Sequence, residues 1–207
     1  MARGCLLALE GVDGCGKTTQ AGFLAAALEK LGREVLVTQE PTKGLTGQKL
    51  RQYLTGPSRS LSPTEELHLF IMDRREHVET LIEPALAEGK IVICDRYYYS
   101  TVAYQGALGL DPAEILAQNE SFAPRPDLVF ILTLPVPLAM KRLAGKGRKG
   151  RQLSESPHYL EQVAAIYASL AGPHIRRVDT SLLRPETAHE IILRETLQEL
   201  ERMGQEG

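Results

Sequence analysis

Residues 11–18 read Gly-Val-Asp-Gly-Cys-Gly-Lys-Thr, a loop of the form G-x-x-x-x-G-K-[ST]. An apolar run precedes the loop and a helical pattern opens within it, which is the placement that phosphate binding requires. The glycines let backbone N–H groups converge on phosphate oxygens without obstruction by a Cβ atom. We expect Lys17 to reach the β and γ phosphates of ATP and the Thr18 hydroxyl to hold Mg²⁺. The residues expected to bind ATP here are Gly11, Val12, Asp13, Gly14, Cys15, Gly16, Lys17, Thr18 and Thr19.

Short apolar runs alternate with longer helical patterns on both sides of this loop. Strands are predicted at residues 5–9, 34–38, 91–95, 128–133 and 175–179. Helices are predicted at residues 17–31, 46–54, 63–88, 113–121, 137–144, 157–171 and 185–203. Strands that alternate with helices predict an α/β fold, in which a five-stranded parallel sheet is flanked by helices. We expect a single domain over residues 1–207.

Composition excludes several classes of protein. The chain has 207 residues and ordinary globular usage, with 43% hydrophobic and 24% charged residues, which argues against a disordered or fibrous chain. Its 24 basic and 26 acidic residues give a net charge of −2, so we expect no nucleic-acid partner. No apolar run is long enough for a membrane span, and the first ten residues do not resemble a secretion signal. With three cysteines, we expect a cytoplasmic protein without a disulfide framework.

A carboxylate closes the predicted strand at 91–95. Ligands of parallel sheets gather at the carboxyl ends of the strands. If this strand neighbours the first one, Asp95 lies near Thr18 and completes a Mg²⁺ site. The alternative, which the strand alone leaves equally open, is that Asp95 caps a loop or pairs with Arg96.

Two further segments point to a second substrate. Phe70 and Arg74 share one helical face, where an aromatic ring and a guanidinium group suit a planar base. Spacing alone nevertheless favours a core phenylalanine beside a solvated arginine. After the strand at 91–95, Arg96 is placed to clamp a phosphate and Tyr104 to pack against a sugar. For this segment the residues alone favour an aromatic helix that packs on the sheet.

Taken together, these motifs resemble the thymidylate kinase family in order and spacing. The matching stretches are residues 10–20 (EGVDGCGKTTQ), 40–41 (EP), 69–77 (LFIMDRREH), 95–106 (DRYYYSTVAYQG), 126–128 (PDL) and 178–181 (VDTS). The resemblance covers nearly the whole chain and implies a P-loop nucleoside-monophosphate-kinase-like fold. It also implies transfer of the γ-phosphoryl group of ATP to dTMP in dTTP synthesis, with Mg²⁺, in a homodimer.

The resemblance further implies a role for each matching residue. Phe70 stacks on thymine, Arg74 donates to its 4-oxo group, and Thr101 and Gln105 line the base pocket. Asp13 binds the 3′-hydroxyl group, Tyr104 lies under the sugar, and Arg96 and Arg51 hold the 5′-phosphate. Arg142 stacks on the adenine of ATP, which the turn at residues 179–182 borders.

A basic segment at about 141–155 is the expected lid. On its own such a segment is more typical of a solvated or nucleic-acid-binding patch. The family has one form with an arginine inside the phosphate loop and another with arginines in the lid. Because Gly14 and Cys15 stand where the first form has its arginine, we expect Arg148 and Arg151 to be the catalytic arginines, together with Lys17 and Arg96. The chain departs from the family after Glu40-Pro41, where Thr-Lys-Gly replaces the usual Gly-Gly-Thr.

The chemistry expected from these residues needs no general base, because a phosphate monoester is mostly dianionic at pH 7. One alternative is another nucleoside or nucleoside-monophosphate kinase of this fold, in which Glu10 or Asp13 would be the candidate base. A more remote alternative is a nucleotide-switch binding module. We also expect the Cys15 thiol, at a helix N-terminus near Lys17, to undergo alkylation that ATP protects against, although the residue alone favours an inert small side chain.

Overall fold

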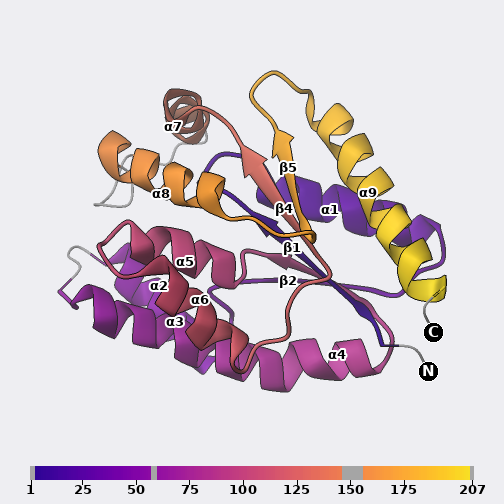
Figure 1. The fold of residues 1–207 in the computed structure, drawn as a ribbon, viewed down its shortest axis with the longest axis horizontal. Helices are drawn as coiled ribbons and strands as arrows, with labels where there is room; N and C mark the ends of the chain where they lie inside the picture. The colour runs from indigo at the N-terminus through magenta and orange to yellow at the C-terminus, as the bar shows by residue number, and fades with distance from the viewer. Residues whose placement is uncertain (1–2, 57–59, 146–155, 206–207) are drawn as a thin grey trace.

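The computed structural model describes residues 3–56, 60–145 and 156–205. These residues form one parallel sheet with the strand order β2-β3-β1-β4-β5 (Figure 1). The strands are β1 (Cys5–Glu10), β2 (Val35–Gln39), β3 (Ile91–Asp95), β4 (Leu128–Thr133) and β5 (Ile175–Asp179). The α/β class and the five-stranded parallel sheet predicted from the sequence are therefore confirmed.

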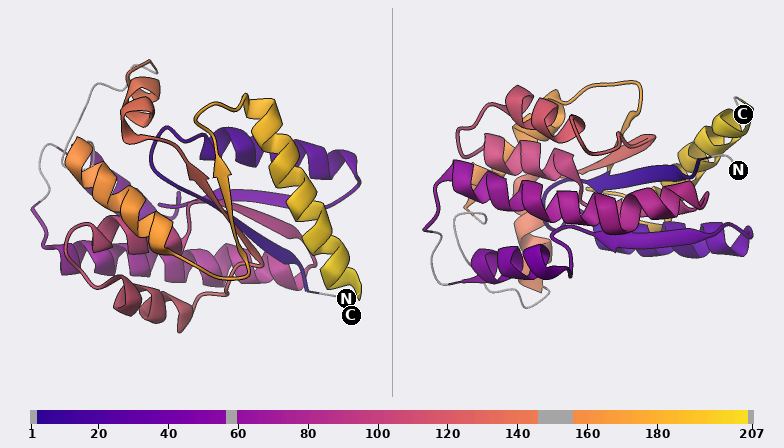
Figure 2. Two further views of the ribbon diagram at one scale, coloured as in Figure 1. Left: turned by 45° about the horizontal axis from the view of Figure 1, so that its top comes forward. Right: turned by 90° about the horizontal axis from the view of Figure 1, so that it is seen from below.

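Helices cover both faces of this sheet (Figures 1 and 2). The helices are α1 (Lys17–Lys30), α2 (Leu45–Thr55), α3 (Pro63–His77), α4 (Glu83–Ala87), α5 (Tyr98–Gly106), α6 (Pro112–Glu120), α7 (Val136–Gly145), α8 (Pro157–Ser169) and α9 (Pro185–Gln205). On one face α1 and α9 pack on each other and on the strands. On the other face α5 contacts α3, α6 and α8, and α2 contacts α3. Within the described parts of the chain, no helix is both long and apolar enough to cross a membrane.

The pairing of β1 with β3 brings the two most informative motifs together. Leu9 lies opposite Asp95 in this parallel pair, and β1 is buried along its full length. The carboxyl ends of the two strands therefore meet at one edge of the sheet, where β1 continues into the phosphate loop and β3 into α5. This is the juxtaposition that a ligand site at a parallel sheet requires.

Helix α5 is not among the helix ranges predicted above, but it confirms the aromatic helix packed on the sheet that the residues of this segment alone favour. Its residues Tyr98, Tyr99, Thr101 and Val102 are aromatic or β-branched, types that favour strands over helices. In the structure all four are buried, and Tyr98 and Tyr99 belong to the main core. Packing against the sheet and the neighbouring helices therefore overrides the local preference of this segment.

The predicted helix over residues 63–88 is interrupted. A π-helical turn, η1 (Val78–Ile82), separates α3 from α4. The Glu83 N–H group donates to the Val78 carbonyl, five residues back, and Pro84 follows with no N–H group to donate. In a regular α-helix the Pro84 ring would clash with the carbonyl of Thr80. The wider π-helical turn before Pro84 relieves this clash.

The start of α3 follows the sequence signal. Ser62 accepts a hydrogen bond from the Glu65 N–H group at 3.3 Å, and the Glu65 carboxylate accepts one from the Ser62 N–H group at 2.8 Å. This capping box satisfies N–H groups that a helix end leaves without partners. It fixes the first turn of the helix that carries Phe70 and Arg74.

We predict that Ser62→Ala lowers the free energy of unfolding by about 1 kcal/mol, because the cap is lost while the side chain remains small. Urea denaturation monitored by circular dichroism measures the change. Thr64→Ala, an exposed substitution in the same first turn, is the control and should change stability far less. Equal losses in the two variants would contradict a capping role for Ser62.

Candidate active site

The phosphate loop has the backbone shape that its glycines permit. Gly11, Gly14 and Gly16 have positive φ angles of 131°, 85° and 107°, a region that other residues rarely adopt. A Cβ atom on Gly14 would come within 2.8 Å of the Ala139 carbonyl oxygen, so α7 packs closely on the loop. The Lys17 Nζ atom donates to the carbonyls of Gly11 and Val12, each at 3.0 Å. The loop thus curls around the ammonium group at the start of α1.

Thr18 and Asp95 meet as the neighbouring strands predict. The Thr18 hydroxyl donates to Asp95 Oδ2 at 2.5 Å, which sets two oxygen ligands side by side at the mouth of the loop. A hydroxyl and a carboxylate are hard oxygen ligands of the kind that Mg²⁺ takes together with substrate phosphates. The alternative pairing of Asp95 with Arg96 is not adopted, because the Arg96 guanidinium pairs with Asp13.

Arg96 occupies the position between the two halves of the site. Its φ angle of 71° lies in the left-handed region, an unusual backbone for a residue other than glycine. Its guanidinium group donates to Asp13 at 2.7 Å, to the Gly11 carbonyl at 3.2 Å and to Ser100 Oγ at 3.0 Å. It also lies over the Tyr104 ring, 5.1 Å from the centroid. These contacts hold a cation beside the phosphate loop. Because a strained backbone is retained mainly at functional positions, we infer that the placement of Arg96 serves function.

Two hollows meet at Arg96. One, of about 580 Å³, is lined by the phosphate loop together with Thr18, Arg51 and Asp95. The other, of about 230 Å³, has an aromatic and amide lining. Its lining includes Asp13, Glu66, Phe70, Arg96, Tyr104 and Gln105. We call this second hollow the acceptor pocket; Asp13, Pro41 and Arg96 line both hollows, so two ligands bound there would face each other across them.

Behind the acceptor pocket lies a buried ion pair between Arg74 and Glu40. The Arg74 guanidinium donates to the Glu40 carboxylate, to Asn119 Oδ1 at 2.6 Å and to Thr101 Oγ1 at 3.0 Å. Arg74 is only 1% exposed, so it is not the solvated side chain that its spacing alone favours. Burial by itself would raise the pKa of Glu40, but the Arg74 charge and the hydrogen bond with His77 outweigh that effect and hold the pKa below its usual value.

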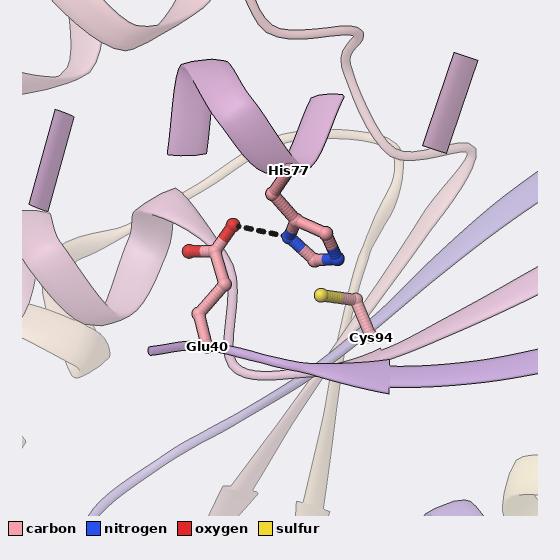
Figure 3. Close-up of side chains that lie close together, drawn as sticks. All are labelled: Glu40, His77 and Cys94. Atoms are coloured by element: carbon pink, nitrogen blue, oxygen red, sulfur yellow. Dashed lines mark hydrogen bonds and ion pairs between the residues drawn. The ribbon is translucent and has the colours of Figure 1, made fainter. Parts of the chain in front are cut away.

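Glu40, His77 and Cys94 lie close together, as Figure 3 shows, with potential ligand atoms within 4.8 Å of one another. A metal ion would have to displace existing partners. His77 Nδ1 is bonded to Glu40 at 3.0 Å, and Nε2 is bonded to Thr38 Oγ1 at 2.8 Å. The Arg74 cation already balances the Glu40 carboxylate. We therefore assign this cluster to the positioning of Arg74 and not to metal binding.

Glu10, the candidate base of the alternative kinase, is also fully buried. Its carboxylate accepts hydrogen bonds from the Tyr97 N–H group at 2.7 Å, from Ser100 at 2.5 Å and from Tyr167 at 3.0 Å. Burial raises the pKa of this carboxyl, although the hydrogen bonds act against the shift. Both carboxylate oxygens of Glu10 are therefore occupied by hydrogen bonds that fix the start of α5. Glu10 has a structural role and is not positioned to take a proton from a substrate.

The remaining predicted residues are distributed as follows. Thr101 lies behind the acceptor pocket on Arg74, and Arg51 donates to the carbonyls of Pro41 and Thr42. Arg142, at the end of α7, donates to the Thr180 carbonyl at 2.7 Å and so lies at the turn expected to border adenine. Arg148 and Arg151 lie outside the described residues, as does most of the lid expected at 141–155.

Cys15 requires a correction. Its side chain is 1% exposed, and its Sγ atom lies 3.7 Å from Lys17 Nζ. A reagent does not reach the thiol in this arrangement, which contradicts the expected alkylation and favours the alternative of an inert small residue. The helix N-terminus is where it was predicted, but no local pattern indicates that the loop buries the sulfur. The sequence analysis also missed Glu66 and Tyr167, because nothing local marks a residue that acts through tertiary contacts.

A family model and several known proteins match most of this chain. The family model described as thymidylate kinase matches residues 9–192. A thymidylate kinase of Desulfotalea psychrophila is 45% identical over 190 residues, which cover 92% of this chain and 93% of that protein. A thymidylate kinase of Xanthomonas campestris pv. campestris is 48% identical over 178 residues, or 86% of this chain and 77% of that protein. One of Xanthomonas oryzae pv. oryzae has the same identity and coverage.

We predict that Glu40→Gln lowers the free energy of unfolding at pH 7 by about 3 kcal/mol, because the Arg74 cation is left buried without a countercharge. The pKa of Glu40 is depressed in the folded chain, so its stabilisation is present above the ordinary carboxyl range. It is lost as the pH falls through the folded-state pKa, and the difference between wild type and variant should shrink in acid.

Urea denaturation at a series of pH values measures this difference. Glu88→Gln is the matched control, because Glu88 pairs with Lys90 on the surface, where an ion pair contributes little. A pH-independent difference between wild type and Glu40→Gln would show that the charge of Glu40 is not what stabilises the fold.

Proposed function

The chain belongs to the thymidylate kinase family, and from that premise we propose how its residues transfer the γ-phosphoryl group of ATP to the 5′-phosphate of dTMP, giving ADP and dTDP for dTTP synthesis. The observation that carries this proposal is the position of Arg96. Its guanidinium group touches the phosphate loop through Gly11 and lines the acceptor pocket as well. A phosphate in that pocket would lie against a fixed cation and face the γ-phosphate of ATP.

The donor is held by the loop and the start of α1. Backbone N–H groups of residues 11–19 bind its phosphates, and Lys17 turns from the Gly11 and Val12 carbonyls to the β and γ oxygens. Thr18 and Asp95 hold Mg²⁺, which supplies charge neutralisation on the phosphates. Arg142 stacks on adenine next to the turn that includes Thr180.

The acceptor is held at three points. Phe70 stacks on the thymine ring, and Tyr104 lies under the sugar, where its ring is already fixed beneath Arg96. Arg96 and Arg51 bind the 5′-phosphate, and Asp13 binds the 3′-hydroxyl group. Fixed cations on both phosphates offset the repulsion between two anionic nucleotides, which is the main obstacle to the reaction.

Two buried polar atoms, one behind the acceptor pocket and one in its lining, suit the hydrogen-bonding face of such a base. Among the described residues, Arg74 Nε has no hydrogen-bond partner, and neither has Gln105 Oε1. The first is a donor and the second an acceptor. Thymine presents the complement, a carbonyl at C4 and an N–H group at N3, whereas cytosine presents an amino group and a lone pair. Unpaired buried polar atoms are unfavourable, so this arrangement supports a 4-oxo pyrimidine as the acceptor base.

Phosphoryl transfer then needs positioning and not a base. The acceptor phosphate is mostly dianionic at pH 7, since its second pKa is about 6. Arg148 and Arg151 of the lid approach the transferred group and stabilise charge on its equatorial oxygens. Closure of the lid also excludes water, which would otherwise hydrolyse ATP.

We further propose that residues 1–207 act as one domain, with a lid at about 141–155, in a cytoplasmic homodimer without nucleic-acid or membrane partners. Two exposed apolar side chains, Val37 of edge strand β2 and Leu81 of η1, line one cleft, where a second copy would bury them. All three cysteines are free, in keeping with a reducing compartment.

We predict that ADP release from ATP depends on the acceptor, with dTMP far ahead of dCMP and of thymidine. dCMP mismatches both hydrogen bonds to the base, and thymidine lacks the phosphate that Arg96 and Arg51 bind. A coupled ADP assay with Mg²⁺ measures the three rates. Comparable rates without any acceptor would instead support a nucleotide switch, and a preference for thymidine would support a nucleoside kinase.

We predict that Arg148→Ala and Arg151→Ala each lower kcat by a factor on the order of 10 to 1,000, with a much smaller effect on the KM for dTMP. Steady-state kinetics at saturating ATP separates the two parameters. Lys30→Ala, an exposed change in the last turn of α1, is the charge-matched control. Unchanged kcat in both arginine variants would overturn the assignment of the lid as the source of catalytic charge.

A further inference from the structure

Glu66 lies inside the acceptor pocket, where the proposed mechanism gives it no task. It stands one helical turn before Phe70 on α3 and lines the same pocket. Its side chain is buried, with 3% of the residue exposed, although glutamate is rarely buried unless it is paired. Its Oε1 atom accepts a hydrogen bond from Gln105 Nε2 of α5 at 2.8 Å. A buried carboxylate at a base pocket therefore makes direct contact with a residue that lines that pocket.

This contact fixes which end of the Gln105 amide is engaged. A glutamine amide carries donors on nitrogen and an acceptor on oxygen, and a half-turn exchanges the two. Carboxylate oxygens only accept, so Glu66 selects the orientation in which Nε2 faces it. Gln105 Oε1 is then left buried, without a partner among the described residues.

An acceptor that the protein leaves unpaired is suited to a donor on the ligand. The N3 atom of a 4-oxo pyrimidine carries a hydrogen, whereas N3 of cytosine carries a lone pair. Were the amide reversed, Nε2 would meet the N3–H group donor to donor. The orientation of one amide therefore decides which class of pyrimidine is accepted at this position.

We propose that Glu66 is a specificity-positioning residue, which holds Gln105 so that its Oε1 atom accepts from the N3–H group of the acceptor base. Glu66 acts through Gln105 and not on the reacting atoms. The inference rests on the proposed function, because it requires a pyrimidine monophosphate in the acceptor pocket.

The test is Glu66→Gln, which keeps the size of the side chain but lets it donate as well as accept. Gln105 is then free to reverse. We expect the ratio of kcat/KM for dTMP to that for dCMP to fall about tenfold, mainly through a higher KM for dTMP. Glu79→Gln, which removes an exposed carboxylate from η1, is the control and should leave the ratio unchanged.

The exchanged pair Glu66→Gln with Gln105→Glu supplies the rescue. The carboxylate now stands at position 105, where its second oxygen faces the base as an obligatory acceptor, so the ratio should recover towards that of the wild type. A role of Glu66 in folding alone would give a lower melting temperature without this recovery of specificity. An unchanged ratio in Glu66→Gln, or no recovery in the exchanged pair, would overturn the proposal.

The same series separates this inference from the proposed function. If the wild-type protein does not phosphorylate dTMP, both fall together. If it does, but the ratio of kcat/KM for dTMP to that for dCMP is the same in Glu66→Gln as in the wild type, only the role of Glu66 is contradicted. A crystal structure of the wild-type protein with dTMP is an independent check, in which Gln105 Oε1 should lie within hydrogen-bonding distance of N3. A base bound away from Gln105 would overturn the proposal even if the variants failed to fold.

Discussion

The guanidinium group of Arg96 is the interaction on which the arrangement of the site depends. It binds Asp13 and the Gly11 carbonyl on the donor side, and Ser100 and Tyr104 on the acceptor side. Arg96 thereby joins the phosphate loop to α5 through several polar contacts. The unusual backbone of Arg96 at the end of β3 is what directs the side chain back across the sheet edge. Strain at such a position persists only where the surroundings over-determine it, and here the buried Glu10 carboxylate anchors both the Tyr97 N–H group and Ser100.

Sequence reasoning succeeded wherever structure is determined locally or by simple periodicity. The phosphate loop is recognisable because its glycines, its lysine and the flanking strand and helix all lie within one short segment. The sheet is recognisable because strands buried on both faces are nearly continuously apolar, as β1 and β3 are up to the carboxylate that ends each of them. The meeting of Thr18 with Asp95 was one of two interpretations that the sequence left equally open, and the pairing of β1 with β3 decided between them. The loop and the sheet needed only neighbouring residues, whereas the placement of Asp95 also needed the order of the strands.

The features that sequence reasoning missed or left open are those created by tertiary contacts. Helix α5 is built from residues that favour strands, and it is helical because its side chains pack into the core. Burial of Cys15 depends on the path of the loop above it. The partner of Arg74 is Glu40, 34 residues earlier in the chain, and no pattern of spacing indicates that two charged side chains so far apart are buried together. The resemblance to a family supplied expectations for Arg74 and Gln105, but not the network that holds them.

The hydrogen bonds around Arg74 and Gln105 show how a pocket with few contacts could distinguish one base from another in the proposed function. An arginine on a solvated surface samples many rotamers, and a hydrogen bond formed there loses much of its value to entropy and to competition with water. Arg74 is instead surrounded by Glu40, Asn119 and Thr101, so its remaining donor has a fixed direction before any ligand binds. Glu66 likewise fixes the orientation of the Gln105 amide by accepting a hydrogen bond from its Nε2 atom. Buried charge is unfavourable in itself, and in the proposed function its benefit is a donor and an acceptor held in place, which discriminate between bases in a way that mobile groups do not. If the proposed function holds, specificity resides as much in the residues behind the pocket as in those that line it.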